Sequence, residues 1–251
     1  MSARGWADAA LSGQFPGPGM GAPHSAGFYL ADDFTHLATI DWTATTIGGV
    51  APTYSNVAPT TYLTHGIHRT QTAATTGTGG VLLRSTVADL YRIPPPGSRW
   101  ACRVRTSSAA NYEFCSGFVS GTGFIRTADA TEMIGIRGDR AVDGNLWGVV
   151  KDGAGAGNES TVDLGVSCEG STWQAVGFDV EGDTTTPSIQ FYLYDLTSRL
   201  AWMRKPVGDP ITTNIPAGPL FSCALHVVAR ANSAKTVDLD WWNLGGRSAR
   251  G

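Results

Sequence analysis

The stretch that most constrains the fold is residues 173–195, WQAVGFDVEGDTTTPSIQFYLYD. Its first half alternates apolar residues with small or polar ones, and its second half does the same after a gap rich in Gly, Asp, Thr and Pro. A period of two residues is the side-chain period of a β-strand, and two such runs around a turn predict a hairpin. The apolar series expected to face a core is Val176, Phe178, Val180, Ile189, Phe191 and Leu193.

Composition extends this expectation to the whole chain. Charged residues are 16% of the 251 residues, against roughly 25% in an ordinary soluble protein, and there are 32 glycines. Residues that favour helices are scarce, and about a dozen alternating segments recur at roughly 8–12-residue spacing. A long apolar strand is expected over 221–230 and a closing strand over 236–244. This pattern predicts an all-β sandwich or barrel.

Two segments are expected to depart from this regular spacing. Residues 48–80 are dominated by Gly, Ala, Thr and Pro, which predicts a long loop or a peripheral hairpin. A short strand is expected near 200–204, followed by the turn-rich DPITTNIPAGP.

Charge and hydropathy bear on the partners. The net charge is −3, and the basic residues form no stripe, so nucleic acid is not an expected partner. No segment approaches the ~20 apolar residues of a membrane span. The N-terminal sequence lacks the apolar core of a secretion signal, so we expect synthesis in a cytoplasm and no membrane contact.

At this point a family resemblance emerges from the order of the strand patterns. W-x-x-V-x-F-x-V-x-G from Trp173, I-x-F-Y-L from Ile189 and V-D-L-D-W-W from Val237 resemble the concanavalin A-like (LamG-like) jelly roll. In that family the D-D-F at Asp32 corresponds to an opening strand that pairs with the closing strand. The resemblance implies a jelly-roll β-sandwich over residues 28–246. An extended N-terminal arm (1–27) precedes it, and a short C-terminal tail (247–251) follows.

The spacing of the carboxylates in the sequence argues against catalysis. Glycosidases use a pair of carboxylates, and those of this fold resemble E-x-D-x-x-E on one strand. The chain has five glutamates, and none of them begins an E-x-D-x-x-E sequence. Asp238 and Asp240 share one strand face, and we favour a hydrogen-bonded outer face for them over a catalytic pair. We therefore predict no catalytic residues and no enzyme.

Metal and cofactor signals are weak. No C-x-x-C pair is present, and Cys102 and Cys115 are expected to be buried free thiols, with a disulfide between them as the alternative. His65 and His68 would point to opposite faces of a strand. Asp-Gly turns such as Gly182-Asp183 offer oxygen ligands to calcium, but tight turns need the same residues. We predict no metal and no cofactor.

Aromatic residues expected outside the core are the candidates for partner contact. Trp242 on the closing strand and Tyr192 and Tyr194 on the hairpin are expected on outer faces, as subunit contacts, a second packed face or a sugar platform. In the N-terminal arm the candidate anchors are Trp6, Leu11 and Phe15.

The functional expectation follows from these features together. Low charge, a Gly/Thr-rich surface and the arm resemble bacteriophage virion proteins in style. We therefore expect a non-enzymatic capsid decoration (cement) protein, a homotrimer in the virion that contacts the major capsid protein or another virion protein. The alternative is a lectin-like carbohydrate-binding module or tail-fibre domain that recognises host glycans.

Overall fold

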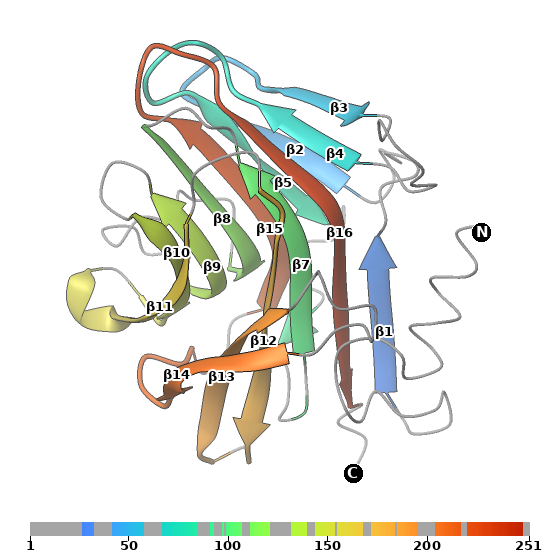
Figure 1. Ribbon diagram of the computed structural model, residues 1–251, viewed down its shortest axis with the longest axis vertical. Helices are drawn as coiled ribbons and strands as arrows, with labels where there is room; N and C mark the ends of the chain where they lie inside the picture. Colours follow the sequence, from blue (N-terminus) through green and yellow to red (C-terminus); the bar gives the residue numbers. More distant parts are fainter. Residues whose placement is uncertain are drawn as a thin grey trace.

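The computed structural model describes residues 27–32, 42–57, 67–84, 91–92, 97, 99–106, 111–120, 132–139, 144–153, 155–167, 172–183, 185–194, 204–216 and 220–247. These residues form sixteen strands and one 3-10 turn, η1 (Ala156–Asn158). The strands make two eight-stranded sheets in which neighbouring strands run antiparallel (Figure 1).

The first sheet is built around the predicted hairpin and the closing strand. Its order is β14 (Arg204–Ile211), β13 (Pro187–Tyr194), β12 (Gln174–Gly182), β7 (Arg99–Thr106), β16 (Thr236–Arg247), β4 (Ile67–Gln71) and β3 (Thr53–Val57), with β1 (Gly27–Asp32) also paired to β16.

The second sheet contains the long apolar strand near its centre. Its order is β11 (Glu159–Ser167), β10 (Asn145–Lys151), β9 (Met133–Asp139), β8 (Tyr112–Val119), β15 (Leu220–Ala229), β5 (Gly79–Arg84) and β2 (Trp42–Ile47), with β6 (Tyr91–Arg92) also paired to β15. The two sheets form a concanavalin A-like jelly-roll sandwich, which confirms the predicted fold class.

The hydrophobic core lies between the two sheets, and the hairpin β12–β13 supplies its middle. Phe178 and Phe191 are register partners, and their ring centroids lie 5.7 Å apart. Phe178 also stacks on Trp100 of β7 at 5.5 Å and meets Phe118 of the second sheet edge-on at 5.9 Å. Side chains from both sheets therefore interlock around one buried ring, as the alternation in the sequence predicted.

The closing strand pairs with the opening strand as expected, and its pairing with β7 is interrupted once. β16 pairs with β1, with Leu30 opposite Leu244, which confirms the predicted partnership of opening and closing strands. A register shift between Leu239 and Trp241 then interrupts the pairing with β7. Past this irregularity Trp242 stands opposite Cys102, a buried core residue. The register of β16 against β7 therefore changes once along the strand.

The two segments expected to depart from the regular spacing contribute strands to the two edges of the first sheet. Residues 53–71 contain the hairpin β3–β4 at one edge of the first sheet, so the peripheral-hairpin alternative is confirmed. At the other edge β14 spans 204–211, which starts where the strand expected near 200–204 was to end and extends into the expected turn from Asp209. Pro206 and Pro210 are tolerated there because an edge strand leaves one side without ladder hydrogen bonds.

The strand limits extend the predicted sandwich by one residue at each end, to Gly27 and Arg247. The remaining arm (1–26) and tail (248–251) lie outside the described residues. Within the described residues, no helix has the length and apolar character needed to cross a membrane.

Candidate functional site

The outward side of the second sheet carries an unusual set of side chains for a solvent face. On β8 the residues Tyr112, Phe114 and Phe118 point into the core, so the alternation turns Glu113 and Cys115 outward. We call the outward side chains of β8, β9, β10, β11 and β15 the second-sheet face.

Strand register arranges this face in rows. His226 of β15 stands opposite Cys115 of β8, which stands opposite Arg137 of β9. The same row continues through Trp147 of β10 to Asp163 of β11. In the next row Glu113 stands opposite Asp139. Because directly opposed residues in an antiparallel ladder have neighbouring side chains, each row is a line of contacts across the sheet.

Much of the second-sheet face is buried although it lies outside the core. The exposed fraction is 1% for Glu113 and 0% for Cys115 and His226. Arg230 donates from one nitrogen, Nη2, to both Glu113 and Asp139. Arg137 donates to Glu159 at 2.8 Å. Buried charges of this kind persist only when they are paired, so the ion pairs are a condition for the fold of this face.

Glu113 and Asp139 form a carboxylate pair that the sequence search missed. Both accept from the same nitrogen, so their bonded oxygens lie within two hydrogen-bond lengths, about 6 Å. Retaining glycosidases hold their carboxyl groups at about 5–5.5 Å. A general acid must donate its proton to the substrate, so acid catalysis here requires that the contact with Arg230 be broken.

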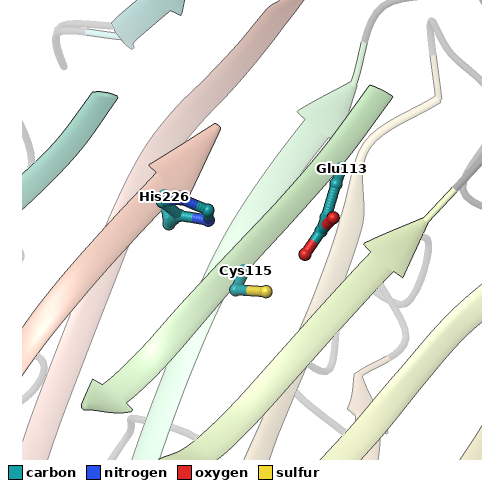
Figure 2. A group of neighbouring side chains, drawn as sticks. All are labelled: Glu113, Cys115 and His226. Carbon is teal, nitrogen blue, oxygen red and sulfur yellow. The ribbon is translucent and has the colours of Figure 1, made fainter. Parts of the chain in front are cut away.

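A mixed ligand set lies beside this pair. One ligand atom each from Glu113, Cys115 and His226 lies within 4.8 Å of the others, and Figure 2 shows His226 extending from β15 toward the two residues on β8. Burial raises the pKa of the Cys115 thiol well above its usual range, and the charge of Glu113 adds to the effect. The prediction of no metal-binding residues did not consider this set, since two of its members are on one strand and the third is on another.

Trp147 lies in the same row, next to its exposed end at Asp163. Its side chain is half-buried against the small cluster of Cys115, Met133 and Val149. The indole Nε1 has no hydrogen-bond partner within the described part of the chain. Next to the ring, the exposed Asp163 accepts two hydrogen bonds of 3.0 Å from Asn145. An aromatic surface beside a carboxylate and an amide is typical of sites that bind polar ring compounds.

The outward side of the first sheet, the first-sheet face, has a different character. Arg69 and Arg105 both hydrogen-bond to Asp238, at 2.7 and 2.6 Å for their closest contacts. Burial opposes ionisation of Asp238, but the two arginines outweigh it and lower the pKa of this carboxyl. The hydrogen-bonded outer-face interpretation of Asp238 is confirmed; the side chain of Asp240 lies outside the described residues.

The predicted partner-contact tyrosines lie on the first-sheet face but are not exposed. Tyr192 and Tyr194 point away from the core, yet their exposed fractions are only 8% and 7%. Tyr192 donates to Glu181 at 3.0 Å, and Arg204 stacks over its ring at 4.1 Å. Burial raises the pKa of Tyr192 to about 12. The expectation of freely exposed aromatic rings at these two positions is therefore wrong, because neighbouring side chains cover them.

The remaining predicted contact residues lie beyond what the structure describes. Trp6, Leu11 and Phe15 fall in the undescribed arm, and the side chain of Trp242 is also outside the described set. Their proposed contacts stay predictions.

Three further expectations can be compared with the structure. Cys102 and Cys115 are both buried thiols that form no disulfide with each other, which confirms the thiol interpretation. His68 is fully buried and lies 6.0 Å from the ring of Tyr54, while His65 lies outside the described residues. Asp183 accepts 2.7 Å hydrogen bonds from the backbone of Thr185 and Thr186, as tight-turn chemistry predicts.

No protein-family model and no curated protein sequence matches the chain. Solved structures match in fold. A β-glucanase from Bacillus licheniformis has a TM-score of 0.54 at 15% identity, covering 88% of this chain and 98% of that chain. A prokaryotic β-1,3-1,4-glucanase (lichenase) from a mouse hindgut metagenome has a TM-score of 0.55 at 12% identity, covering 86% and 98%. An immunostimulatory antigen and pseudo β-1,3-glucanase of Mycobacterium tuberculosis has a TM-score of 0.51 at 14% identity, covering 86% and 98%.

These similarities correct the predicted function. We expected a virion protein, a capsid decoration (cement) protein without enzymatic activity. The similar structures named here are glucanases and a pseudo-glucanase, including a non-specific endo-β-1,3(4)-glucanase of family GH16, and not virion proteins, which contradicts that expectation. The search for carboxylates had considered only pairs on one strand, and it missed Glu113 and Asp139 on two strands. The homotrimer and the location of the protein are not tested by a single chain and stay predictions.

Proposed function

We propose that this protein is carbohydrate-active and that its ligand is a β-linked glucan. The fold is similar to that of β-glucanases over 86–88% of the chain, and the observation that carries the proposal is Trp147 beside Asp163 and Asn145. At these identities the likeness establishes the fold alone, so the assignment of the ligand rests on the site.

The second-sheet face offers the groups that a glucan needs. A sugar ring stacks through its C–H face on an aromatic ring. The half-buried indole of Trp147 supplies the aromatic ring, next to the exposed Asp163. Asp163 and Asn145 lie beside it with carboxylate and amide groups for hydroxyls. Arg137 follows in the same row toward β8. A glucan chain would therefore lie across β11 and β10 with Trp147 under one sugar ring.

Binding tests the proposal directly. In native gels the protein should be retarded by β-1,3-1,4-glucan and not by dextran, an α-linked glucan. Trp147→Ala should weaken binding by about tenfold or more, equivalent to about 1.4 kcal/mol. Equal mobility with and without several β-linked glucans would contradict the proposal.

A second candidate function is hydrolysis of the same glucan. Glu113 and Asp139 favour it, because their shared contact with Arg230 keeps the bonded oxygens within about 6 Å, a limit that includes the separation of a retaining glycosidase pair. Release of reducing ends from β-glucan should then disappear in Glu113→Gln and in Asp139→Asn. It should persist in the control Glu181→Gln, an exposed carboxylate of the first sheet. Activity that survives both substitutions would exclude this pair.

A further inference from the structure

The side chains of Glu113, Cys115 and His226 offer three different types of metal ligand. Their ligand atoms lie within 4.8 Å of one another and come from neighbouring central strands (Figure 2). We propose that these three residues bind a zinc ion.

Backbone pairing holds the three ligands in place. His226 is the direct register partner of Cys115, and Glu113 precedes Cys115 by two residues on the same face. β8 is paired on both sides, with β9 and with β15. Ligands on paired central strands are positioned more accurately than ligands on loops.

The ligand types select zinc. Zinc binds thiolate at about 2.3 Å, imidazole at about 2.0–2.1 Å and carboxylate at about 2.0–2.2 Å, in tetrahedral geometry. Ligand atoms around such an ion are about 3.3–3.8 Å apart, so the set has to contract by about 1 Å through side-chain rotation. Calcium and magnesium prefer all-oxygen sets, and a sulfur ligand disfavours both.

Neighbouring groups support this assignment. Arg230 contacts Glu113 through Oε2, and the same nitrogen also holds Asp139. Zinc would take the other oxygen, Oε1, while Arg230 orients the carboxylate from outside, as second-shell partners of metal ligands commonly do. On binding, the Cys115 S–H bond breaks, the sulfur binds zinc and the proton leaves to solvent. A fourth position remains for water or another ligand.

A bound zinc ion would also decide between the two candidate functions. Glu113 cannot ligate zinc and act as a glycosidase carboxylate, so zinc at this site would exclude hydrolysis by the Glu113–Asp139 pair. Glucan recognition at Trp147 does not depend on the metal.

The test is the metal content of the full-length protein without a histidine tag. Mass spectrometry after dialysis should find about one zinc per chain. Cys115→Ser and His226→Asn should lower retention at least tenfold, whereas Cys102→Ala, which removes a buried thiol on the other sheet, should leave it unchanged.

Cobalt binding by the wild-type protein is a second measurement, which does not depend on the folding of a variant. Cobalt added to the metal-free wild-type protein should give a thiolate-to-cobalt charge-transfer absorption, and zinc should displace it. Cys102→Ala should behave as the wild type. Absence of zinc as purified, together with absence of the cobalt absorption in folded wild-type protein, would overturn the proposal and leave a packed thiol–imidazole pair.

Discussion

The two outer faces of the sandwich follow the same alternation but hold their charges differently. On the first-sheet face one carboxylate, Asp238, has two arginines, and the side chains of Arg69 and Arg105 remain 33% and 30% exposed. On the second-sheet face one arginine, Arg230, serves two carboxylates, and the Glu113 side chain is 1% exposed. In the first arrangement two partly solvated cations share one carboxylate, whereas in the second one cation is shared by two buried carboxylates.

The largest expected effect is the loss of that cation. Arg230→Ala leaves the buried carboxylates of Glu113 and Asp139 without this partner. Removing one member of a buried ion pair costs about 3–5 kcal/mol, which should appear in the free energy of unfolding measured with urea. Addition of Glu113→Gln to Arg230→Ala should recover part of the loss, since it removes one of the two charges.

The next effect tests whether the burial of a charged group, and not the sheet to which it belongs, determines its effect on stability. His68 belongs to the first sheet, yet it is fully buried, and burial lowers its pKa to about 4. The unfolded chain binds a proton at this histidine below about pH 6.5, but the folded chain does so only below about pH 4. Stability should therefore be complete above pH 6.5 and should fall by about 3 kcal/mol as the pH decreases to 4.

His68→Gln is the matched variant for this prediction. Glutamine keeps a hydrogen-bonding group near Thr70, which lies 3.0 Å from His68 Nε2, and it does not titrate. Urea unfolding between pH 4 and 7 should show a shallower slope for the variant. Identical slopes for the two proteins would contradict the role of His68.

The smallest effect is expected on the first-sheet face. Arg105→Ala removes hydrogen bonds to Asp238 and a contact 4.6 Å above the ring of Trp173. Arg69 keeps two hydrogen bonds to the same carboxylate. For a partly exposed arginine with such a backup we expect a loss of about 1 kcal/mol or less. A loss as large as that of Arg230→Ala would break the distinction between the two faces.

The fold was largely predictable because it depends on local periodicity. The alternation around Phe178 and Phe191 specified both strands of the hairpin and their inner face. The V-D-L-D pattern likewise predicted the closing strand. The sequence did not predict the register shift between Leu239 and Trp241 in the pairing with β7. No residue in that apolar stretch signals the shift, because it depends on how β7 pairs with it.

The candidate site was less predictable because it depends on pairing between distant residues. Glu113 and Asp139 become neighbours only through the register of β8 and β9, and His226 joins Cys115 only through β15. Sequence alone offered one usable signal, the spacing E-x-C on an alternating strand, which puts both side chains on one face. The covering of Tyr192 by Arg204 was likewise not predictable, since it depends on the pairing of β14 with β13.

The central claim is that a β-glucan binds the second-sheet face, and two tryptophans on opposite faces test it most directly. Calorimetric titration with a β-1,3-1,4-gluco-oligosaccharide should be carried out on wild type, Trp147→Ala and Trp173→Ala. Both rings are half-buried, but Trp173 lies under Arg103 and Arg105 on the first-sheet face. The account predicts that Trp147→Ala weakens binding about tenfold or more and that Trp173→Ala leaves it unchanged. Undiminished binding by Trp147→Ala, or a greater loss in Trp173→Ala, would contradict it.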